Sequence, residues 1–323
     1  MRIKKYFRAF CKYITDADYR FLLNAAHGKY DDMPDKEYLE RKFKSCIGKP
    51  LDLAAPQTLN EKLQWLKLYN RRPEYTMMVD KFLVRDYIKE KLGEEYLIPL
   101  LGVWDNPDEI DFDALPNQFV LKCNHNSGLG MYICKDKSKL TPDDIKSIRR
   151  NLARGLAQDY YLTGREWPYK NVPRKVICEQ YMTDPSGNGL TDYKFYCFNG
   201  KVKLLGIYKD RSSKTPTTAD FFDRNYVWQD IKWGMPHSKV MPSKPELLEP
   251  MIEIAETLSQ RIPEVRVDLY LCGKTIYFGE LTFFDGSGFD KIEPAAFDKQ
   301  MGDWLVLPAP YAESQQAEDG RCR

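Results

Sequence analysis

Two carboxylates, one guanidinium and one hydroxyl occur at strand-like spacing in the C-terminal part of the chain. Arg266 and Asp268 are two residues apart in one apolar run, and Glu280 and Thr282 are two apart in the next. Because side chains alternate along a strand, the two members of each pair share one face. A Gly-Lys turn separates the two runs, so we predict a hairpin on which both pairs face the same side.

Carboxylates inside a sheet are costly unless a cation neutralises them. A Mg²⁺ ion can do so, because it prefers hard oxygen ligands and bridges protein carboxylates to nucleotide phosphates. Asp268 and Glu280 are therefore candidate metal ligands. The alternative is a solvated strand face with an ordinary salt bridge between Arg266 and Asp268, and the hairpin alone leaves both interpretations open.

The composition is that of an ordinary soluble globular protein of 323 residues, with 49 basic and 47 acidic side chains. A net charge of +2 argues against a dedicated nucleic-acid-binding protein. Charges interrupt the chain too often for a transmembrane helix or a signal peptide. The eight cysteines include no CxxC pair and the three histidines are scattered, so we expect reduced thiols in the cytoplasm and no zinc site.

The first 30 residues are expected to be helical, with apolar residues at helical spacing among lysines and arginines. Such a basic helix can lie on an anionic membrane, but we favour packing against its own domain. A second helical region runs from residue 58 to 92, opened by a Thr-x-x-Glu capping box and broken by Pro73. Lys81 and Arg85 lie one turn apart in its second half, where a solvated helix surface is the ordinary explanation.

A glycine-rich turn follows a predicted strand at residues 117–123. The sequence NQFVLKC is followed by NHNSGLG and by a second strand, MYICK. Backbone N–H groups of such a turn can bind phosphate oxygens, and Lys122 would add a positive charge at its edge. The glycine spacing matches neither the dinucleotide fingerprint nor the P-loop, so a plain hairpin turn is the alternative.

The remaining elements follow from turn and capping signals. Thr141 opens a helix, and residues 174–182 form an apolar strand that ends near Glu179. After a turn-rich linker, residues 192–198 form a strand with Asp192 and Lys194 on one face, and Asn-Gly at 199–200 predicts a type I′ hairpin. Ser243 and Glu246 predict a capped helix, although Pro250 argues for a kink or a late start, and residues 296–305 predict a closing helix.

Five motifs occur in an informative order: TLNEKLQWLKLYNR, VDKFLVRDY, FVLKCNHNSG, DYKFYCFNG and VDLY…YFGELTF. In this order they resemble the ATP-grasp superfamily of carboxylate–amine ligases. More closely they resemble its TupA-like branch, which is associated with teichuronopeptide and other cell-surface polysaccharide biosynthesis. The resemblance covers about Pro56 to Leu305. It implies an α+β ATP-grasp fold, with two β-rich lobes gripping the nucleotide and an N-terminal helical region.

The resemblance also implies a division of the chain. Residues 1–75 would form the helical region, and residues 76–182 the pre-ATP-grasp segment and the ATP-binding lobe with the glycine-rich loop. Residues 183–310 would form the C-terminal lobe with the Mg²⁺ site, and residues 311–323 a disordered tail.

Nucleotide contacts are implied for ten residues. Lys122 and, as a weaker match, Lys81 would approach phosphate oxygens, and Glu179 would face the adenine amino group. Asp192 would bind the ribose hydroxyls. The backbone from Gln180 to Met182 would read the adenine edge, and the loop over the phosphates would contribute Asn124, Ser127, Gly128 and Gly130.

The resemblance also implies roles in the reaction for residues of the predicted hairpin. Asp268 and Glu280 would hold Mg²⁺, Arg266 would lie beside the transferred phosphoryl group, and Lys194 and Arg211 would contact phosphate or acyl phosphate. Many ATP-grasp enzymes have Asn at the third metal position, where this chain has Thr282. A hydroxyl is a poorer ligand, which argues against a second tightly held Mg²⁺. The turn at residues 285–288 lies where related ligases bind the acceptor.

The activity implied is an ATP-dependent ligase that forms an acyl phosphate and then an amide. For this family, a uronic acid or similar carboxylated sugar and an amino acid or amine are the expected substrates. A glycosyltransferase, a non-catalytic ATP-grasp protein and an ATP-grasp kinase are the alternatives. Turnover of ATP rather than of a sugar nucleotide would distinguish the ligase from a glycosyltransferase. An amide product rather than a phosphorylated one would distinguish it from a kinase.

Overall fold

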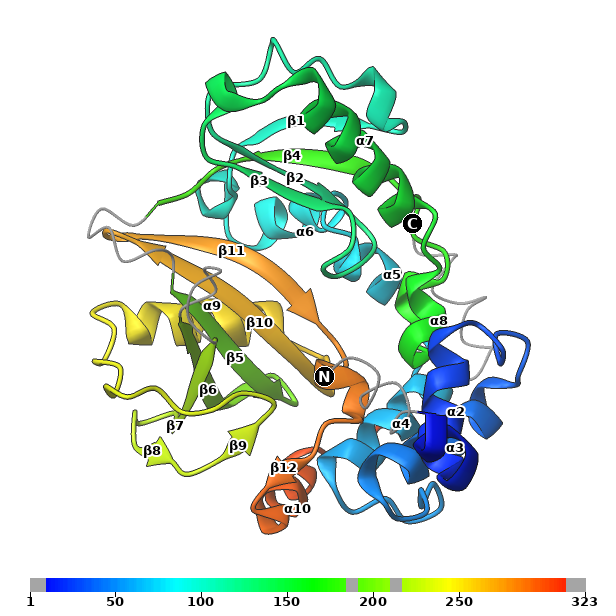
Figure 1. Cartoon of the computed structure of the whole chain (residues 1–323). Helices are drawn as coiled ribbons and strands as arrows, with labels where there is room; N and C mark the ends of the chain where they lie inside the picture. Colours follow the sequence, from blue (N-terminus) through cyan, green and yellow to red (C-terminus); the bar gives the residue numbers. More distant parts are fainter. Residues whose placement is uncertain (1–9, 184–190, 210–216, 312–323) are drawn as a thin grey trace, which may run out of the picture. The chain divides into compact units, whose positions relative to one another are not determined.

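The computed structural model describes residues 10–183, 191–209 and 217–311, which form two compact units (Figure 1). Unit 1 contains the described residues of Met1–Arg72, Tyr161–Trp167 and Phe284–Arg323. Unit 2 contains the described residues of Pro73–Tyr160 and Pro168–Phe283. The division into four parts expected from the sequence remains a prediction, and its tail lies outside the described residues.

Unit 1 is built mainly from helices. They are α2 (Ala17–Ala26), α3 (Asp35–Ile47), α4 (Leu59–Tyr69) and α10 (Ala295–Trp304), with the short strand β12 (Ile292–Glu293), the 3₁₀ turn η5 (Asp285–Gly288) and the end of α8 (Tyr160–Gly164). The predicted capping box of α4 is confirmed, because Thr58 and Glu61 bond each other's backbone N–H groups. The closing helix is confirmed as α10. Phe21, Leu39, Phe43 and Phe289 lie in the core of the unit.

The described residues of unit 2 contain four further α-helices: α5 (Glu74–Val79), α6 (Val84–Lys91), α7 (Pro142–Leu156) and α9 (Leu248–Leu258). The break at Pro73 is confirmed, but the predicted second helix is itself divided. Lys81 lies in the turn between α5 and α6, since Asp80 accepts the backbone N–H groups of Phe82 and Leu83 and interrupts the helix.

The helix α9 begins later than its predicted cap. Its first residue is Leu248, and no side chain caps it, so the capping box at Ser243 and Glu246 was wrong. Pro250 instead occupies the first turn, where an α-helix leaves backbone N–H groups without intrahelical partners. Within the described parts of the chain, no helix is long and apolar enough to cross a membrane.

A four-stranded antiparallel sheet forms one part of unit 2. Its strands are β1 (Leu100–Trp104), β2 (Phe119–Cys123), β3 (Met131–Cys134) and β4 (Val176–Gln180), in the order β1-β4-β2-β3. Phe119 and Leu121 of β2 point into a core that includes Ile148 and Leu152 of α7. Strand alternation therefore places Lys122 on the opposite face.

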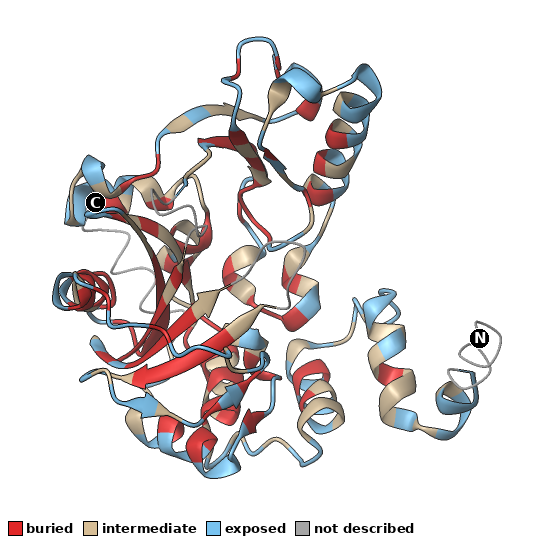
Figure 2. Ribbon diagram, turned by 60° about the vertical axis from the view of Figure 1, so that its left-hand side comes forward, coloured by how far each residue is buried: buried red, intermediate tan, exposed pale blue. Residues whose placement is uncertain are grey.

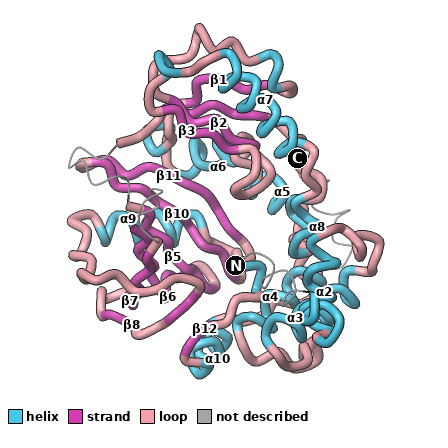
Figure 3. Tube along the Cα trace, in the orientation of Figure 1, coloured by secondary structure: helices cyan, strands magenta, loops and turns pink. Residues whose placement is uncertain are grey.

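A six-stranded antiparallel sheet forms the other part, as Figure 3 shows. Its strands are β5 (Asp192–Phe198), β6 (Lys201–Lys209), β7 (Thr218–Asp223), β8 (Trp228–Gln229), β10 (Glu264–Cys272) and β11 (Thr275–Thr282), in the order β11-β10-β5-β6-β7-β8; the two-residue strand β9 (Lys232–Trp233) follows β8 in the chain. The predicted type I′ turn is confirmed, because Asn199 and Gly200 have φ of 50° and 78°. The central strands are almost wholly buried (Figure 2).

The six-stranded sheet separates apolar from charged side chains by strand alternation. Phe195 of β5 is paired with Val267 of β10, and Cys197 of this face contacts Ala255 of α9. Lys194 is paired with Asp268 on the opposite face. The helix α9 thus covers the apolar face, and the charged face carries the predicted site.

A β-bulge at Gly279 determines which face of the sheet the following side chains of β11 occupy. Leu269 pairs with Phe278 but its neighbour Asp268 pairs with Glu280, so Gly279 is the extra residue. A Cβ atom at position 279 would lie 3.0 Å from the carbonyl oxygen of Asp268, which favours glycine there. Because of the bulge, Phe278 lies on the α9 side whereas Glu280 lies on the charged side.

Candidate active site

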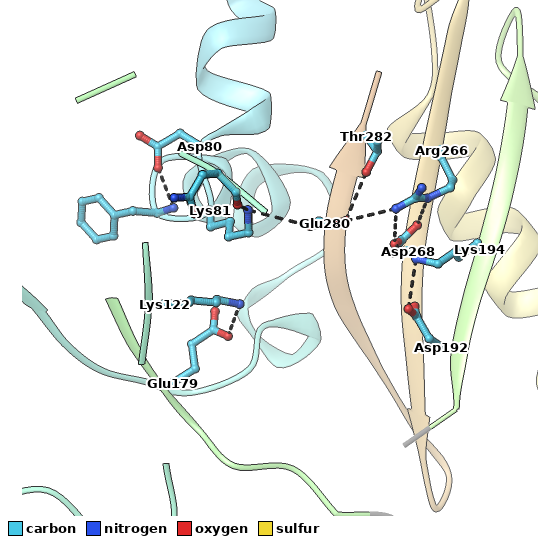
Figure 4. A network of polar contacts seen from close by, with 12 residues as sticks. Asp80, Lys81, Lys122, Glu179, Asp192, Lys194, Arg266, Asp268, Glu280 and Thr282 are labelled. Carbon is cyan, nitrogen blue, oxygen red and sulfur yellow. Dashed lines mark hydrogen bonds and ion pairs between the residues drawn. The ribbon is translucent and has the colours of Figure 1, made fainter. Parts of the chain in front are cut away.

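The charged side chains of unit 2 form a network that draws on six segments of the chain (Figure 4). Strands β5, β10 and β11 of the six-stranded sheet contribute one group, and β2, β4 and the turn before α6 contribute another. An ion pair from Lys81 Nζ to Glu280 Oε2, 3.9 Å long, connects the two groups. Most of the predicted site residues are thus brought together.

The hairpin of β10 and β11 holds Arg266 between two carboxylates. Arg266 Nε and Nη2 donate to the two oxygens of Asp268, at 2.6 and 2.8 Å, and Nη2 also reaches Glu280 Oε1 at 3.1 Å. Lys194 of β5 donates to Asp268 as well and lies 3.0 Å from Asp192. The expected salt bridge is present, but the face is buried, so the alternative of a solvated face was wrong.

Glu280 is the most accessible carboxylate of this group. Its side chain is 37% exposed, and Oε1 also accepts a hydrogen bond of 3.2 Å from Thr282 Oγ1. Partial burial would raise the pKa of Glu280, but attraction by Lys81, Arg266, Lys194 and Lys122 outweighs this and lowers the pKa to about 2. Glu280 is therefore ionised at neutral pH.

Asp268 differs from Glu280 in its surroundings. Its side chain is 3% exposed, and burial raises its pKa above the ordinary value although Arg266 and Lys194 oppose the shift. Both of its oxygens already accept hydrogen bonds from cations. Asp268 thus orients Arg266 and Lys194, whereas Glu280 offers oxygen to an incoming group.

Lys81 lies between the glycine-rich loop and Glu280. Its Nζ donates to the carbonyl oxygen of Asn126 at 2.8 Å, and its backbone N–H donates to that of Asn124. Burial lowers its pKa, while Glu280 opposes that shift. The position in a turn, rather than on a helix surface, is what allows the side chain to reach both partners.

The charged face of the four-stranded sheet carries Lys122 and Glu179. Lys122 Nζ lies 2.6 Å from Glu179 Oε2, and Arg85 of α6 lies 3.7 Å from Oε1. Arg85 therefore contacts the site and is not simply part of a solvated helix surface. Glu179 bonds two cations, which fix its carboxylate near the end of β4.

Apolar residues on the same sheet face were missed by sequence reasoning. Cross-strand register places Val120 and Ile133 opposite each other, and Met131 opposite Lys122. Met131 and Ile133 are 46% and 45% exposed, which leaves an apolar surface beside Lys122. The alternation in MYIC is the only sequence signal, and the register is needed to join it to Lys122.

The glycine-rich loop divides into a buried base and an exposed tip. Asn124 is fully buried, and its amide bonds Asp80, the Pro173 carbonyl and the Lys175 N–H, so it ties the loop to the fold. A Cβ at Gly130 would lie 2.6 Å from Cys123 Sγ, which makes close packing its role. Ser127 and Gly128 form the exposed tip, and Gly128 has a φ of 85°.

Three predicted residues lie apart from these contacts. Gln180 ends β4 and is exposed, and Met182 follows the strand and is half-buried. Arg211 lies outside the described residues. The roles of these residues remain predictions.

The donor set of the hairpin suits a Mg²⁺ ion shared with a nucleotide. Asp268 and Glu280 are cross-strand partners on one face, with the hydroxyl of Thr282 bonded to Glu280. No cluster of three or more His, Cys, Asp or Glu ligands occurs in the described segments. Mg²⁺ usually takes one or two protein carboxylates and completes its shell with phosphates and water, so two carboxylates are sufficient.

The first motif of the sequence, in α4, has a separate role in unit 1. Gln64 Nε2 donates to the carbonyl oxygens of Ser287 and Gly288, at 3.0 and 2.8 Å. Lys67 Nζ donates to Gln64 and to the carbonyl oxygens of Gly164 and Ser287, at 3.1, 2.8 and 2.7 Å. These bonds hold the turn η5, in which Ser287 has a φ of 53°.

Comparisons with known proteins identify a family. The model of the TupA-like ATP-grasp family matches residues 61–306, well over half of the chain. No curated protein matches the chain.

Three solved structures illustrate the likeness. D-alanine–D-alanine ligase from Bacillus anthracis is 15% identical over 64% of this chain and 57% of its own, with a TM-score of 0.39. D-alanine–D-alanine ligase from Helicobacter pylori is 14% identical over 78% of this chain and 70% of its own, with a TM-score of 0.42. A RimK domain ATP-grasp protein from Sphaerobacter thermophilus is 12% identical over 74% of this chain and 71% of its own, with a TM-score of 0.40. The chain thus spans little more than half the length of the Bacillus ligase.

The family match covers the segments that build the network and the turn η5, because residues 61–306 run from within α4 to just beyond α10. The expected α+β ATP-grasp fold and the expected family are confirmed. The chain belongs to the TupA-like ATP-grasp family.

Proposed function

We propose that this protein is an ATP-dependent ligase that joins a carboxylate to an amine through an acyl phosphate. The observation that carries the proposal is that Lys81 pairs with Glu280, which contacts Arg266, while Lys122, paired with Glu179, also attracts Glu280, although these residues come from distant parts of the sequence. Cations with an accessible carboxylate suit phosphoryl transfer, which needs positioning and charge stabilisation more than a protein nucleophile.

The proposed reaction has two steps. A substrate carboxylate oxygen attacks the γ-phosphorus of ATP, the bond to the β-phosphate oxygen breaks, and ADP leaves. An amine then attacks the acyl carbon, a C–N bond forms, and the bond to the phosphorylated oxygen breaks. The proton lost by the amine leaves with inorganic phosphate.

The nucleotide contacts are assigned from the two groups of the network. Lys122 and Lys81 approach the phosphates, and the tip at Ser127 and Gly128 covers them. Glu179 lies at the end of β4, beside the apolar surface of Met131 and Ile133, where an adenine ring would be bound. Asp192 is the proposed ribose contact, and the backbone after Glu179 would read the adenine edge.

The transferred phosphoryl group would lie beside the hairpin. Asp268 orients Arg266 and Lys194, and Glu280, together with Asp268, would hold Mg²⁺. When bound, Mg²⁺ neutralises charge on the phosphate oxygens. Thr282 fixes the rotamer of Glu280 through its hydrogen bond.

The substrates follow from the family's association with surface polysaccharides. A uronic acid or similar sugar carboxylate is the proposed acceptor of the phosphoryl group, and an amino acid or other amine the nucleophile. We place the reaction in the cytoplasm, where ATP is available.

Thermal unfolding with and without ligands tests the proposal. Mg-ATP should raise the unfolding midpoint of the wild type, because a ligand that binds the folded state stabilises it by mass action. Glu280→Gln should reduce this shift, whereas Glu253→Gln, on the exposed side of α9, should not.

The donor distinguishes the proposal from its alternatives. A midpoint shift with UDP-sugars and none with Mg-ATP would reject an ATP-dependent ligase. Formation of ADP and phosphate that requires both a carboxylate and an amine would then support the ligase over a kinase.

A further inference from the structure

Four large apolar side chains are exposed at the far edge of the six-stranded sheet. They are Val227, Trp228, Val240 and Met241, with exposed fractions of 56%, 39%, 79% and 50%. We call them the edge patch. Strand β8, which carries Trp228, is the last strand of the sheet order, so no further strand covers it among the described residues.

Two contacts bring the members of the edge patch together. The rings of Trp228 and His237 lie 5.5 Å apart, and Tyr226 Oη donates to the Pro242 carbonyl at 3.0 Å. The segment with Val240 and Met241 therefore runs beside the segment with Val227 and Trp228, fixed at both ends. The four exposed side chains therefore lie within two neighbouring segments at this edge of the sheet.

The edge patch is not required to complete the core of the sheet. Trp233, close by in the chain, is 3% exposed and stacks with Phe221 and Tyr196. That ring fills the interior, whereas Trp228 remains at the surface. An exposed group of large apolar residues on such an edge usually marks a contact with a partner.

Basic side chains surround the edge patch. Residues 224–244 contain four basic and one acidic residue. Arg224 is paired with Glu256 at 3.4 Å, but the exposed Lys232, Lys239 and Lys244 form no ion pair within the described parts of the chain. Asp230 Oδ1 lies 3.4 Å from His237 Nε2, so the three lysines outnumber the one exposed carboxylate of this segment and its net charge is positive.

We infer that the edge patch binds the surface of an anionic lipid bilayer. Apolar side chains would enter the headgroup region while the lysines attract anionic headgroups, an attraction that falls off within a Debye length. A stable protein interface needs about 20 to 30 residues from each side, far more than this patch offers. A few side chains with flanking lysines suit weak, reversible membrane contact instead.

Vesicle co-sedimentation of the full chain tests this inference. Phosphatidylcholine vesicles with about 30 mol% phosphatidylserine should sediment the protein, and pure phosphatidylcholine vesicles should not. The double variant Trp228→Ser, Val240→Asp should lower the bound fraction at least about tenfold, and Lys239→Glu with Lys244→Glu should lower it and reduce its salt dependence. Val306→Asp, at a side chain that is 68% exposed in unit 1, is the matched control.

Several outcomes would overturn the inference. Equal binding to both vesicle types, or binding unchanged in the edge-patch variants, would assign membrane contact elsewhere, for example to the first 30 residues. A concentration-dependent dimer that the same variants abolish, without vesicle binding, would assign the patch to a second copy of the chain. Unchanged unfolding midpoints of the variants would show that a loss of binding is not a loss of fold.

Discussion

Each unit contains buried cations, but their partners differ. In unit 1, Lys67 is fully buried and donates to a side-chain amide and two backbone carbonyl oxygens. In unit 2, Arg266 and Lys194 donate to the carboxylates of Asp268 and Glu280. Backbone carbonyls cannot leave without disturbing the fold, whereas a carboxylate can exchange its partner for a phosphate or a metal ion.

The groups around Lys67 support this distinction. Burial lowers the pKa of Lys67 to about 7, against the attraction of Glu166. Glu166 accepts a hydrogen bond from Ser287 Oγ, and burial raises its pKa. The ring of Phe289 lies 4.5 Å from Lys67 Nζ. Lys67 thus serves to hold the turn η5, whereas the cations of unit 2 are the ones for which we propose a role in the reaction.

The largest effect on stability is expected at Lys67. Lys67→Met should lower the free energy of unfolding by about 3 to 5 kcal/mol, because three buried oxygens lose their donor. Urea denaturation measures the loss. Lys299→Met, at an exposed i,i+4 pair with Asp303, is the control and should change stability by less than about 0.5 kcal/mol. A loss of under about 1 kcal/mol at Lys67 would remove the contrast between the two clusters.

Glu280→Gln should show the opposite pattern. We expect turnover to fall about 10²- to 10³-fold, because a charge that stabilises phosphoryl transfer is lost. The free energy of unfolding should fall only slightly at neutral pH, since the side chain is 37% exposed and solvent screens its ion pairs. Steady-state ADP release measures the turnover, and urea denaturation of the same sample measures the free energy of unfolding. Normal turnover in this variant would disprove the metal role.

Lys122→Ala should have a smaller effect, on nucleotide affinity. Loss of one phosphate contact should raise the KM for ATP about tenfold, or about 1.4 kcal/mol. Lys175→Ala is the matched control, because Lys175 pairs with the exposed Asp105 and lies just before β4. Equal changes in KM for both variants would exclude a specific phosphate contact by Lys122.

The smallest effect is the pH dependence that Glu280 adds to stability. Its folded-state pKa of about 2 lies below the ordinary value of 4.5, so the folded state binds fewer protons than the unfolded state between these values. The stabilisation is complete above about pH 4.5 and is lost as the pH falls toward 2. The stability difference between wild type and Glu280→Gln should therefore shrink between pH 6 and 3. A difference independent of pH would contradict the lowered pKa.

Local signals in the sequence predicted the local structure well. The capping box at Thr58, the helix start at Thr141 and the turn at Asn199 are confirmed, because each depends on residues within a few positions. The faces of β5 and β10 followed from alternation alone. The shared face of Glu280 and Thr282 was predicted in the same way.

Contacts between residues far apart in the chain could not be predicted from the sequence. The oxygens bound by Lys67 lie 97 and 220 residues away in the chain, and helical spacing does not identify them. Lys81 was assigned to a helix because nothing in the pattern shows that Asp80 interrupts it. The apolar surface of Met131 and Ile133 needed the register of β2 and β3.

Gly279 acts on its strand as a frameshift acts on a reading frame. Before Gly279, the side chains of Ile276 and Phe278 lie on the apolar face of the sheet. After Gly279, Leu281 lies on that face, and Glu280 and Thr282 lie on the charged face. A strand that kept Gly279 but alternated regularly after Phe278, with no bulge, would turn Glu280 and Thr282 toward α9. The composition of the site would be unchanged and the site itself would be gone.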